Sequence, residues 1–290
     1  MKKIPPLFIL SLLALLFSSE AYSFILSNFD EPESMVSDPE DGSYYVSNMH
    51  GSMTEKKGTG YISKISASGN IVIQHFIGGQ SDEAFLNAPK GLVIVGRTLC
   101  VADIDTVKVF DKETKKFLAS VDLSVKGALF LNDMTADASG ALYVSDTMAD
   151  KIFKVNPKKS YEISVFASSS ELGGPNGLVF NPKSRNLMVV TWKTGQVLEI
   201  TSGGKIHVLK KNLSTLDGID YDNDGNLYVS NFEKGEVYRI PHMGRGTLST
   251  VLSGLITPAD LSYNHKKNEL LIPSTKGNKI SVIEKRSLAS

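Results

Sequence analysis

Two stretches of the chain, LNDMTADASGALYVSD (residues 131–146) and LDGIDYDNDGNLYVSN (residues 216–231), repeat one pattern and decide the fold. Each contains a polar pair, a short apolar segment, a turn rich in Asp, Asn and Gly, and a second apolar segment that ends in a polar residue. Gly in such a turn permits the positive φ that a tight hairpin needs. Each stretch is therefore predicted to form two antiparallel strands.

The pattern occurs six times along the chain. The other four copies are PESMVSDPEDGSYYVSN (32–48), PKGLVIVGRTLCVAD (89–103), PNGLVFNPKSRNLMVVT (175–191) and PADLSYNHKKNELLIPS (258–274). Measured between the first residues of successive polar pairs, the intervals are 57, 42, 44, 41 and 42 residues, and the longest contains an extra segment at 50–60. Alternating segments such as 151–155 and 236–240 predict a third strand, and a looser fourth strand follows. Repeats of roughly 40 residues with up to four strands are typical of β-propeller blades.

The six copies account for residues 24–290 and leave no room for a second domain. The sixth copy shows only three clear strands, whereas the strand-like segment 24–29 (FILSNF) precedes the first copy. We expect this segment to complete the last blade, because joining the two termini removes an open sheet edge. The sequence thus predicts an all-β, six-bladed β-propeller whose N-terminal strand closes the last blade.

Residues 1–23 are predicted to be a signal peptide. Lys2 and Lys3 precede an apolar run of 11 residues at 7–17, and small residues follow at positions 21 and 23. A short membrane anchor is the alternative, although the run is short for a bilayer span. We expect a secreted or periplasmic protein that has no membrane contact after cleavage.

Composition excludes several classes of protein. The chain has 31 Lys and Arg residues against 31 Asp and Glu residues, so its charge gives no signal for nucleic-acid binding. Its one cysteine, Cys100, excludes an intramolecular disulfide framework and a Cys-rich zinc site, and its apolar neighbours predict that it is buried. The five His residues occupy unrelated repeat positions, so no His metal site is predicted. The oligomeric state is not indicated.

The first residue of each polar pair occupies one equivalent position in the repeat. Because the innermost strand of each blade lines the central channel, these residues are expected to form a ring at one channel mouth. This anchor ring consists of Glu33, Lys90, Asn132, Asn176, Asp217 and Ala259. Its two carboxylates and two carboxamides are hard oxygen ligands that suit calcium or magnesium, with manganese and zinc as further candidates.

Two of the anchor pairs have an alternative interpretation, because Asn-Gly and Asp-Gly are common turn formers. The metal interpretation is favoured, since four oxygen-bearing residues share one repeat position while the turns of the repeat lie elsewhere. A second recurrent polar position follows the second strand of each blade, and it is predicted to cap backbone groups at the strand end. Its members are Asn48, Asp103, Asp146, Thr191, Asn231 and Ser274.

The phrases PESMVSDP, LNDMTADASGALYVSD, GPNGLVFNP and LDGIDYDNDGNLYVSN resemble the senescence-marker-protein/gluconolactonase (regucalcin-like) family, which is related to paraoxonase-like lactonases. The resemblance covers all six repeats. It implies a six-bladed propeller that holds a divalent cation, usually calcium, at the channel mouth. The implied metal ligands are Glu33, Asn176, Asp217 and Asn132, the last of which contacts substrate instead in some members.

The chain departs from the family pattern at two positions. Members that hydrolyse sugar lactones commonly carry an Arg two residues before the Asn-Asp pair, where this chain has Phe130. This departure favours a more apolar substrate. Lys90 stands where paraoxonase-like enzymes have a His linked to catalysis. It is predicted to act as a base or oxyanion donor, or alternatively to balance the charges of Glu33 and Asp217.

Two functions follow from these features. The first is a calcium-dependent lactonase or esterase that acts on a small lactone or ester, with Asp217 and Lys90 as catalytic residues and Asn132, Phe130 and Trp192 in contact with substrate. Trp192 forms a wall of the mouth in this view, or packs between blades in the alternative view. The second function is a non-catalytic, NHL-like propeller that binds a protein or glycan.

Overall fold

The computed structural model describes residues 22–70, 72–78 and 85–288. Residues 1–21 of the predicted signal peptide (1–23) lie outside the described residues. Its last two residues, 22 and 23, begin strand β1 (Tyr22–Ser27). Among the described residues, no helix is long and apolar enough to cross a membrane.

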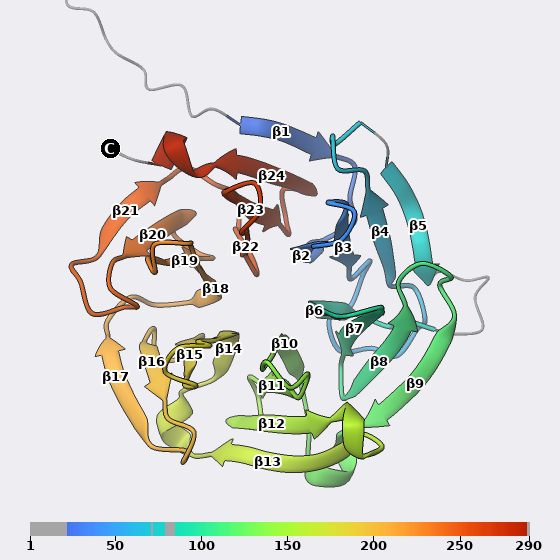
Figure 1. Cartoon of the computed structure of the whole chain (residues 1–290), viewed down its shortest axis with the longest axis horizontal. Helices are drawn as coiled ribbons and strands as arrows, with labels where there is room; N and C mark the ends of the chain where they lie inside the picture. Colours follow the sequence, from blue (N-terminus) through green and yellow to red (C-terminus); the bar gives the residue numbers. More distant parts are fainter. Residues whose placement is uncertain (1–21, 71, 79–84, 289–290) are drawn as a thin grey trace, which may run out of the picture.

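Six four-stranded antiparallel sheets stand around a central axis, as the repeats predict (Figure 1). In the first five blades the strands follow one another from the axis outward. Blade one contains β2 (Pro32–Ser37), β3 (Tyr44–Asn48), β4 (Tyr61–Ile65) and β5 (Val72–Gly78). Blade two contains β6 (Pro89–Val95), β7 (Thr98–Asp103), β8 (Thr106–Asp111) and β9 (Phe117–Asp122). Blade three contains β10 (Leu131–Ala136), β11 (Leu142–Asp146), β12 (Lys151–Asn156) and β13 (Glu162–Ser168).

The second half of the chain continues the same arrangement. Blade four contains β14 (Pro175–Phe180), β15 (Leu187–Thr191), β16 (Val197–Ile200) and β17 (Ile206–Lys210). Blade five contains β18 (Leu216–Tyr221), β19 (Leu227–Asn231), β20 (Glu236–Ile240) and β21 (Ser249–Leu252). Four short 3-10 helices lie in connections or after the last strand: η1 (Ser124–Lys126), η2 (Pro157–Lys159), η3 (Ser170–Leu172) and η4 (Lys285–Leu288).

Blade six joins the two ends of the chain, which confirms the predicted closure. It contains β22 (Ser262–Asn264), β23 (Glu269–Ser274) and β24 (Lys279–Glu284), with β1 as its outermost strand. β1 pairs antiparallel with β24, from Tyr22 opposite Ile283 to Ser27 opposite Lys279. The pairing covers the edge of β24, so the last blade has the same four strands as the others.

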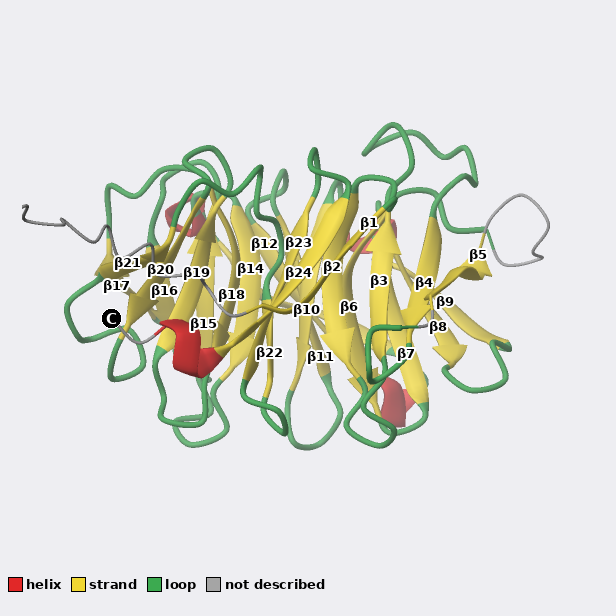
Figure 2. Cartoon of the chain, turned by 90° about the horizontal axis from the view of Figure 1, so that it is seen from above, coloured by secondary structure: helices red, strands yellow, loops and turns green. Residues whose placement is uncertain are grey.

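The apolar core is divided among the six interfaces between adjacent blades. Between blades one and two, for example, Tyr45 and Ile62 pack with Leu99 and Phe110. The side view in Figure 2 shows the strands running between two ends that carry the connecting loops. Because each innermost strand begins at the same end, we call that end the ring end and the opposite end the far end.

The repeat requires glycine at two kinds of position, in hairpin turns and inside the innermost strands. Gly140 and Gly225 turn the hairpins of blades three and five at φ of 85° and 78°, as the sequence predicts. Gly177 and Gly218 lie instead inside β14 and β18, where an added Cβ would meet the backbone of the next blade, at residues 217–219 for Gly177 and at 260–261 for Gly218. The Asn-Gly and Asp-Gly pairs are therefore not turns, and the turn interpretation of these pairs is wrong.

Candidate metal centre at the ring end

Five anchor-ring residues occupy one structural position. Each is the second residue of the innermost strand of its blade, β2, β6, β10, β14 or β18. The sixth, Ala259, precedes β22, and its amide donates to the carbonyl of Pro273. The four proposed oxygen ligands, Glu33, Asn132, Asn176 and Asp217, are only 2% to 7% exposed. A common strand position therefore brings these four side chains to one level of the channel.

The four proposed ligands have oxygen atoms without partners. In the described part of the chain, seven buried side-chain nitrogen or oxygen atoms lack a hydrogen bond. Four of these atoms are Glu33 Oε2, Asn132 Oδ1, Asn176 Oδ1 and Asp217 Oδ1. An unsatisfied buried polar atom is costly, and four such oxygen atoms at one repeat position fit a cationic partner. The orientation of Asn176 agrees, because its Nδ2 donates to the carbonyl of Leu216 at 3.4 Å and leaves Oδ1 free.

The electrostatics of the ring also favour a cation. Burial raises the pKa of Glu33 well above its ordinary value, and the nearby charges of Asp260 and Asp217 raise it further, while Lys90 lowers it. Burial and Asp260 likewise raise the pKa of Asp217. Ionisation of both carboxyl groups is therefore unfavourable in this place. A nearby divalent cation would favour their charged forms.

The donor set fits a hard cation of charge two. Two carboxylates supply two negative charges and two carboxamides supply neutral oxygens, which is the ligand chemistry that calcium and magnesium prefer. Within residues 22–70, 72–78 and 85–288 there is no cluster of three or more His, Cys, Asp or Glu side chains suited to a metal. A site in this ring therefore depends on its Asn residues as well as on its acids.

Lys90 is buried and is held by carbonyl groups. Its Nζ donates to the carbonyl oxygens of Met53 and Ala88, both at 3.2 Å, and lies 4.3 Å from the centre of the Phe130 ring. Burial lowers the pKa of Lys90 to about 8, although Glu33 and Asp103 oppose the shift. Lys90 and Phe130 therefore form one cation–π unit in the wall of the ring.

Trp192 contacts the neighbouring blade at the ring end. It follows β15 at the ring end, is partly exposed, and makes an edge-to-face contact with Phe232 of blade five at 5.3 Å between ring centres.

Cys100 is buried as predicted, and burial raises the pKa of its thiol to about 12.

The second recurrent polar position is structural, as predicted. The carboxylate of Asp103 accepts the amides of Asn87 and Ala88, and that of Asp146 accepts the amides of Leu129, Phe130, Met148 and Ala149. Comparable contacts tie backbone groups at Asn48, Thr191, Asn231 and Ser274. These residues hold the loops that surround the ring.

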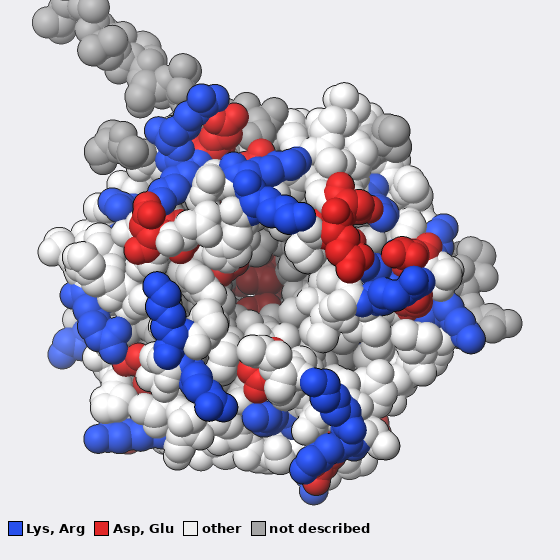
Figure 3. All heavy atoms as spheres, in the orientation of Figure 1, with Lys and Arg blue, Asp and Glu red and all other residues white. Residues whose placement is uncertain are grey.

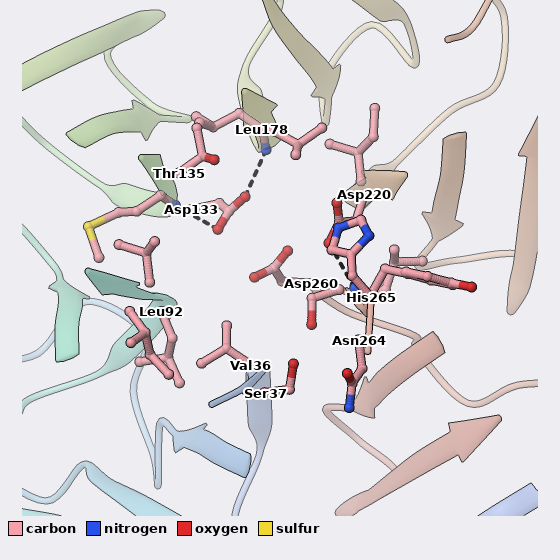
Figure 4. A pocket seen from close by; sticks show the side chains of 18 of the residues that line it. Val36, Ser37, Leu92, Asp133, Thr135, Leu178, Asp220, Asp260, Asn264 and His265 are labelled. Atoms are coloured by element: carbon pink, nitrogen blue, oxygen red, sulfur yellow. Dashed lines mark hydrogen bonds between the residues drawn. The ribbon is translucent and has the colours of Figure 1, made fainter. Parts of the chain in front are cut away.

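Sequence reasoning missed three buried carboxylates beneath the ring. Asp133, Asp220 and Asp260 line a cavity of about 300 Å³, together with residues from the later halves of the innermost strands (Figure 4). Figure 3 shows acidic side chains inside the central opening. Alignment on the first residue of each polar pair hid Asp133 and Asp260, because they are the second residues of their pairs.

Two of these carboxylates join neighbouring blades. Asp133 accepts the amides of Met134 at 2.6 Å and Leu178 at 2.7 Å, and Asp220 accepts the amide of Tyr263 in blade six at 2.7 Å. Asp260 lies at the centre of the cavity, and burial raises its pKa to about 6. Burial also raises the pKa of Asp133 well above its ordinary value and that of Asp220 to about 7, so a cation at the ring would favour the charged forms of all three carboxyl groups.

Comparisons with known proteins agree with the fold. A family model described as "SMP-30/Gluconolactonase/LRE-like region" matches residues 32–259. No curated protein sequence matches the chain.

Solved structures resemble the chain over most of its length. A catalytically inactive virginiamycin B lyase from Staphylococcus aureus with quinupristin is 13% identical, with a TM-score of 0.64 over 90% of this chain and 98% of that one. A streptogramin B lyase is 17% identical, with a TM-score of 0.62 over 90% of this chain and 87% of that one. A protein of unknown function from Bacteroides thetaiotaomicron is 15% identical, with a TM-score of 0.67 over 92% of this chain and 73% of that one. At these identities the likeness shows the fold alone.

Proposed function

The chain belongs to the SMP-30/gluconolactonase/LRE-like family, and from that premise we propose that it is an exported, divalent-cation-dependent hydrolase of a lactone or ester. One observation carries the proposal. Each of the four residues that match the family's metal ligands has a buried side-chain oxygen atom without a hydrogen-bond partner. Calcium is the proposed cation, held by Glu33, Asn132, Asn176 and Asp217. A scaffold that only binds a partner has no need for two buried carboxylates at one level of its channel.

The bound cation would supply a Lewis acid that polarises a carbonyl oxygen. The chain's own residues supply the rest. Asp217 orients water and takes its proton as the water oxygen bonds to the carbonyl carbon. Lys90 donates a hydrogen bond to the oxygen that gains negative charge. The bond between the carbonyl carbon and the leaving oxygen then breaks, and the leaving oxygen takes the proton that Asp217 received from water, so that the alcohol departs. Phe130 keeps the Lys90 ammonium in place.

The proposal is tested by turnover of a panel of lactones and aryl esters by the purified, calcium-loaded protein. We expect hydrolysis that EDTA stops and that added calcium restores. Because two of the structural neighbours are lyases, product analysis must show the hydroxy acid or the free acid and alcohol. No turnover of any member, or only elimination products, would count against the hydrolase.

Replacing Lys90 by Met is expected to lower kcat by about a hundredfold, because one oxyanion donor is lost from a buried site. Lys151→Met is the matched control. Lys151 also donates to two backbone carbonyls, those of Lys126 and Gly127, but it begins β12, the third strand from the axis in blade three. The kcat values of both variants and of the wild type on one aryl ester measure the loss. Equal kcat values for the two variants would show that Lys90 only balances the charges of Glu33 and Asp217.

A further inference from the structure

Exposed apolar side chains fall into two groups among the described residues. Seven of the large ones lie on the outermost strands β1, β5, β9, β13 and β17. The remaining six are 52% to 68% exposed. These six define the apolar collar: Met53, Phe85, Val125, Leu129, Met148 and Ile256.

The collar lies entirely at the ring end. Its members stand in the connections β3–β4, β5–β6, β9–β10, β11–β12 and β21–β22. Each of these connections leaves or enters the end at which the innermost strands begin, since all neighbouring strands are antiparallel. In the described part of the chain, the far-end turns carry none of the large exposed apolar side chains. Exposed apolar side chains that gather at one end of a protein are typical of a binding surface.

Contacts tie part of the collar to the Lys90–Phe130 unit. The carbonyl of Met53 accepts from Lys90 at 3.2 Å, and Leu129 directly precedes Phe130. The carboxylate of Asp146 accepts the amides of Leu129 at 2.6 Å and of Met148 at 3.2 Å, so these two residues flank one side chain. Met53, Leu129 and Met148 therefore stand around the same part of the ring wall.

We propose that this part of the collar binds a hydrocarbon chain of the substrate, so that the enzyme prefers esters or lactones with a long acyl or alkyl group to polar sugar lactones. The inference rests on the proposed function. A sugar would leave the exposed side chains of Met53, Leu129 and Met148 in water, and the side chain of Phe130 offers it no hydrogen bond. A chain that extends from a carbonyl at the ring covers those side chains and removes their apolar surface from water.

The test compares p-nitrophenyl octanoate with p-nitrophenyl acetate in the calcium-loaded protein. We expect the ratio of their kcat/KM values to fall about tenfold in the Leu129→Ser/Met148→Ser variant, since each buried methylene is worth a severalfold preference. Val208→Ser is the control, because Val208 is 53% exposed on β17, away from the ring end. The control should keep the wild-type ratio. A ratio unchanged in the double variant would overturn the proposal.

A second readout separates this inference from the hydrolase. Trp192 is the chain's only tryptophan and lies at the ring end, so its emission can report octan-1-ol binding without turnover. We expect saturable binding that is at least about tenfold weaker in the double variant. If no ester is hydrolysed but this difference appears, the hydrolase fails and the apolar site stands. If the double variant instead loses only self-association or binding to phosphatidylcholine vesicles, the collar serves another partner and the proposal is wrong.

Discussion

Asp217→Asn is expected to reduce hydrolysis by about a thousandfold, the largest effect of any single substitution in the ring. The change keeps the size of the side chain but removes the charge that orients and deprotonates water. It also removes one of the two negative charges offered to the cation. Initial rates on one aryl ester at saturating calcium measure the loss.

The same substitution is expected to stabilise the cation-free protein. Asp217 is buried near Glu33 and Asp260, so removing its charge relieves repulsion that a cation otherwise relieves. The melting temperature in EDTA should rise, while the increase caused by calcium should shrink. Asp224→Asn is the control, because the Asp224 side chain is 73% exposed and pairs with Lys285 outside the ring. Near-normal turnover by Asp217→Asn would show that Asp217 has no catalytic part.

Deleting residues 24–29 is expected to lower the melting temperature by about 10 °C or more. The deletion removes most of β1, its pairing with β24, and the side chains of Phe24, Leu26 and Phe29 from the core between blades six and one. The open edge of β24 would also invite association between chains. Thermal unfolding followed by circular dichroism measures the change.

Point substitutions separate packing from pairing in β1. Phe24→Ala/Leu26→Ala removes two side chains that pack on the core, whereas Ile25→Ala removes one that is 46% exposed between them. The first variant should melt well below the wild type, and the second should melt close to it. An unchanged melting curve after the deletion would mean that the N-terminal strand does not hold the ring closed.

The repeat made the fold predictable. Hairpins such as 137–141 and 222–226 begin with Asp and have Gly three residues later, and six copies at regular spacing allow little besides a propeller. The fourth strand of blade six was predictable for a different reason, because a missing strand at one end of the chain matched a spare strand at the other. Where β1 begins was less predictable, since its first two residues, at 22 and 23, belong to the predicted signal peptide.

The ring was predictable in position but only partly in detail. Equivalence of repeat positions placed Glu33 and Asp217 at one level without any knowledge of distances. It did not show that Lys90 is held by the carbonyl of Met53, because that contact crosses 37 residues and depends on the path of the loop after β3. The buried charge of Asp260 was not predicted either, because the repeat places its uncharged neighbour, Ala259, in the ring.

The apolar collar could not be derived from periodicity. Its residues lie in loops, where a lone Met148 or Leu129 in the sequence has no pattern to distinguish it from a buried residue. Only the exposure of these side chains and their shared end of the propeller identify them as a surface.

The central claim is that four oxygens of the ring hold one divalent cation, and calorimetric titration of EDTA-treated protein with calcium tests it most directly. We predict one calcium ion bound per chain in the wild type and none in Glu33→Gln/Asp217→Asn, with both proteins folded by circular dichroism. Failure of the wild type to bind calcium, magnesium, manganese or zinc, or equal binding by the double variant, would contradict the account.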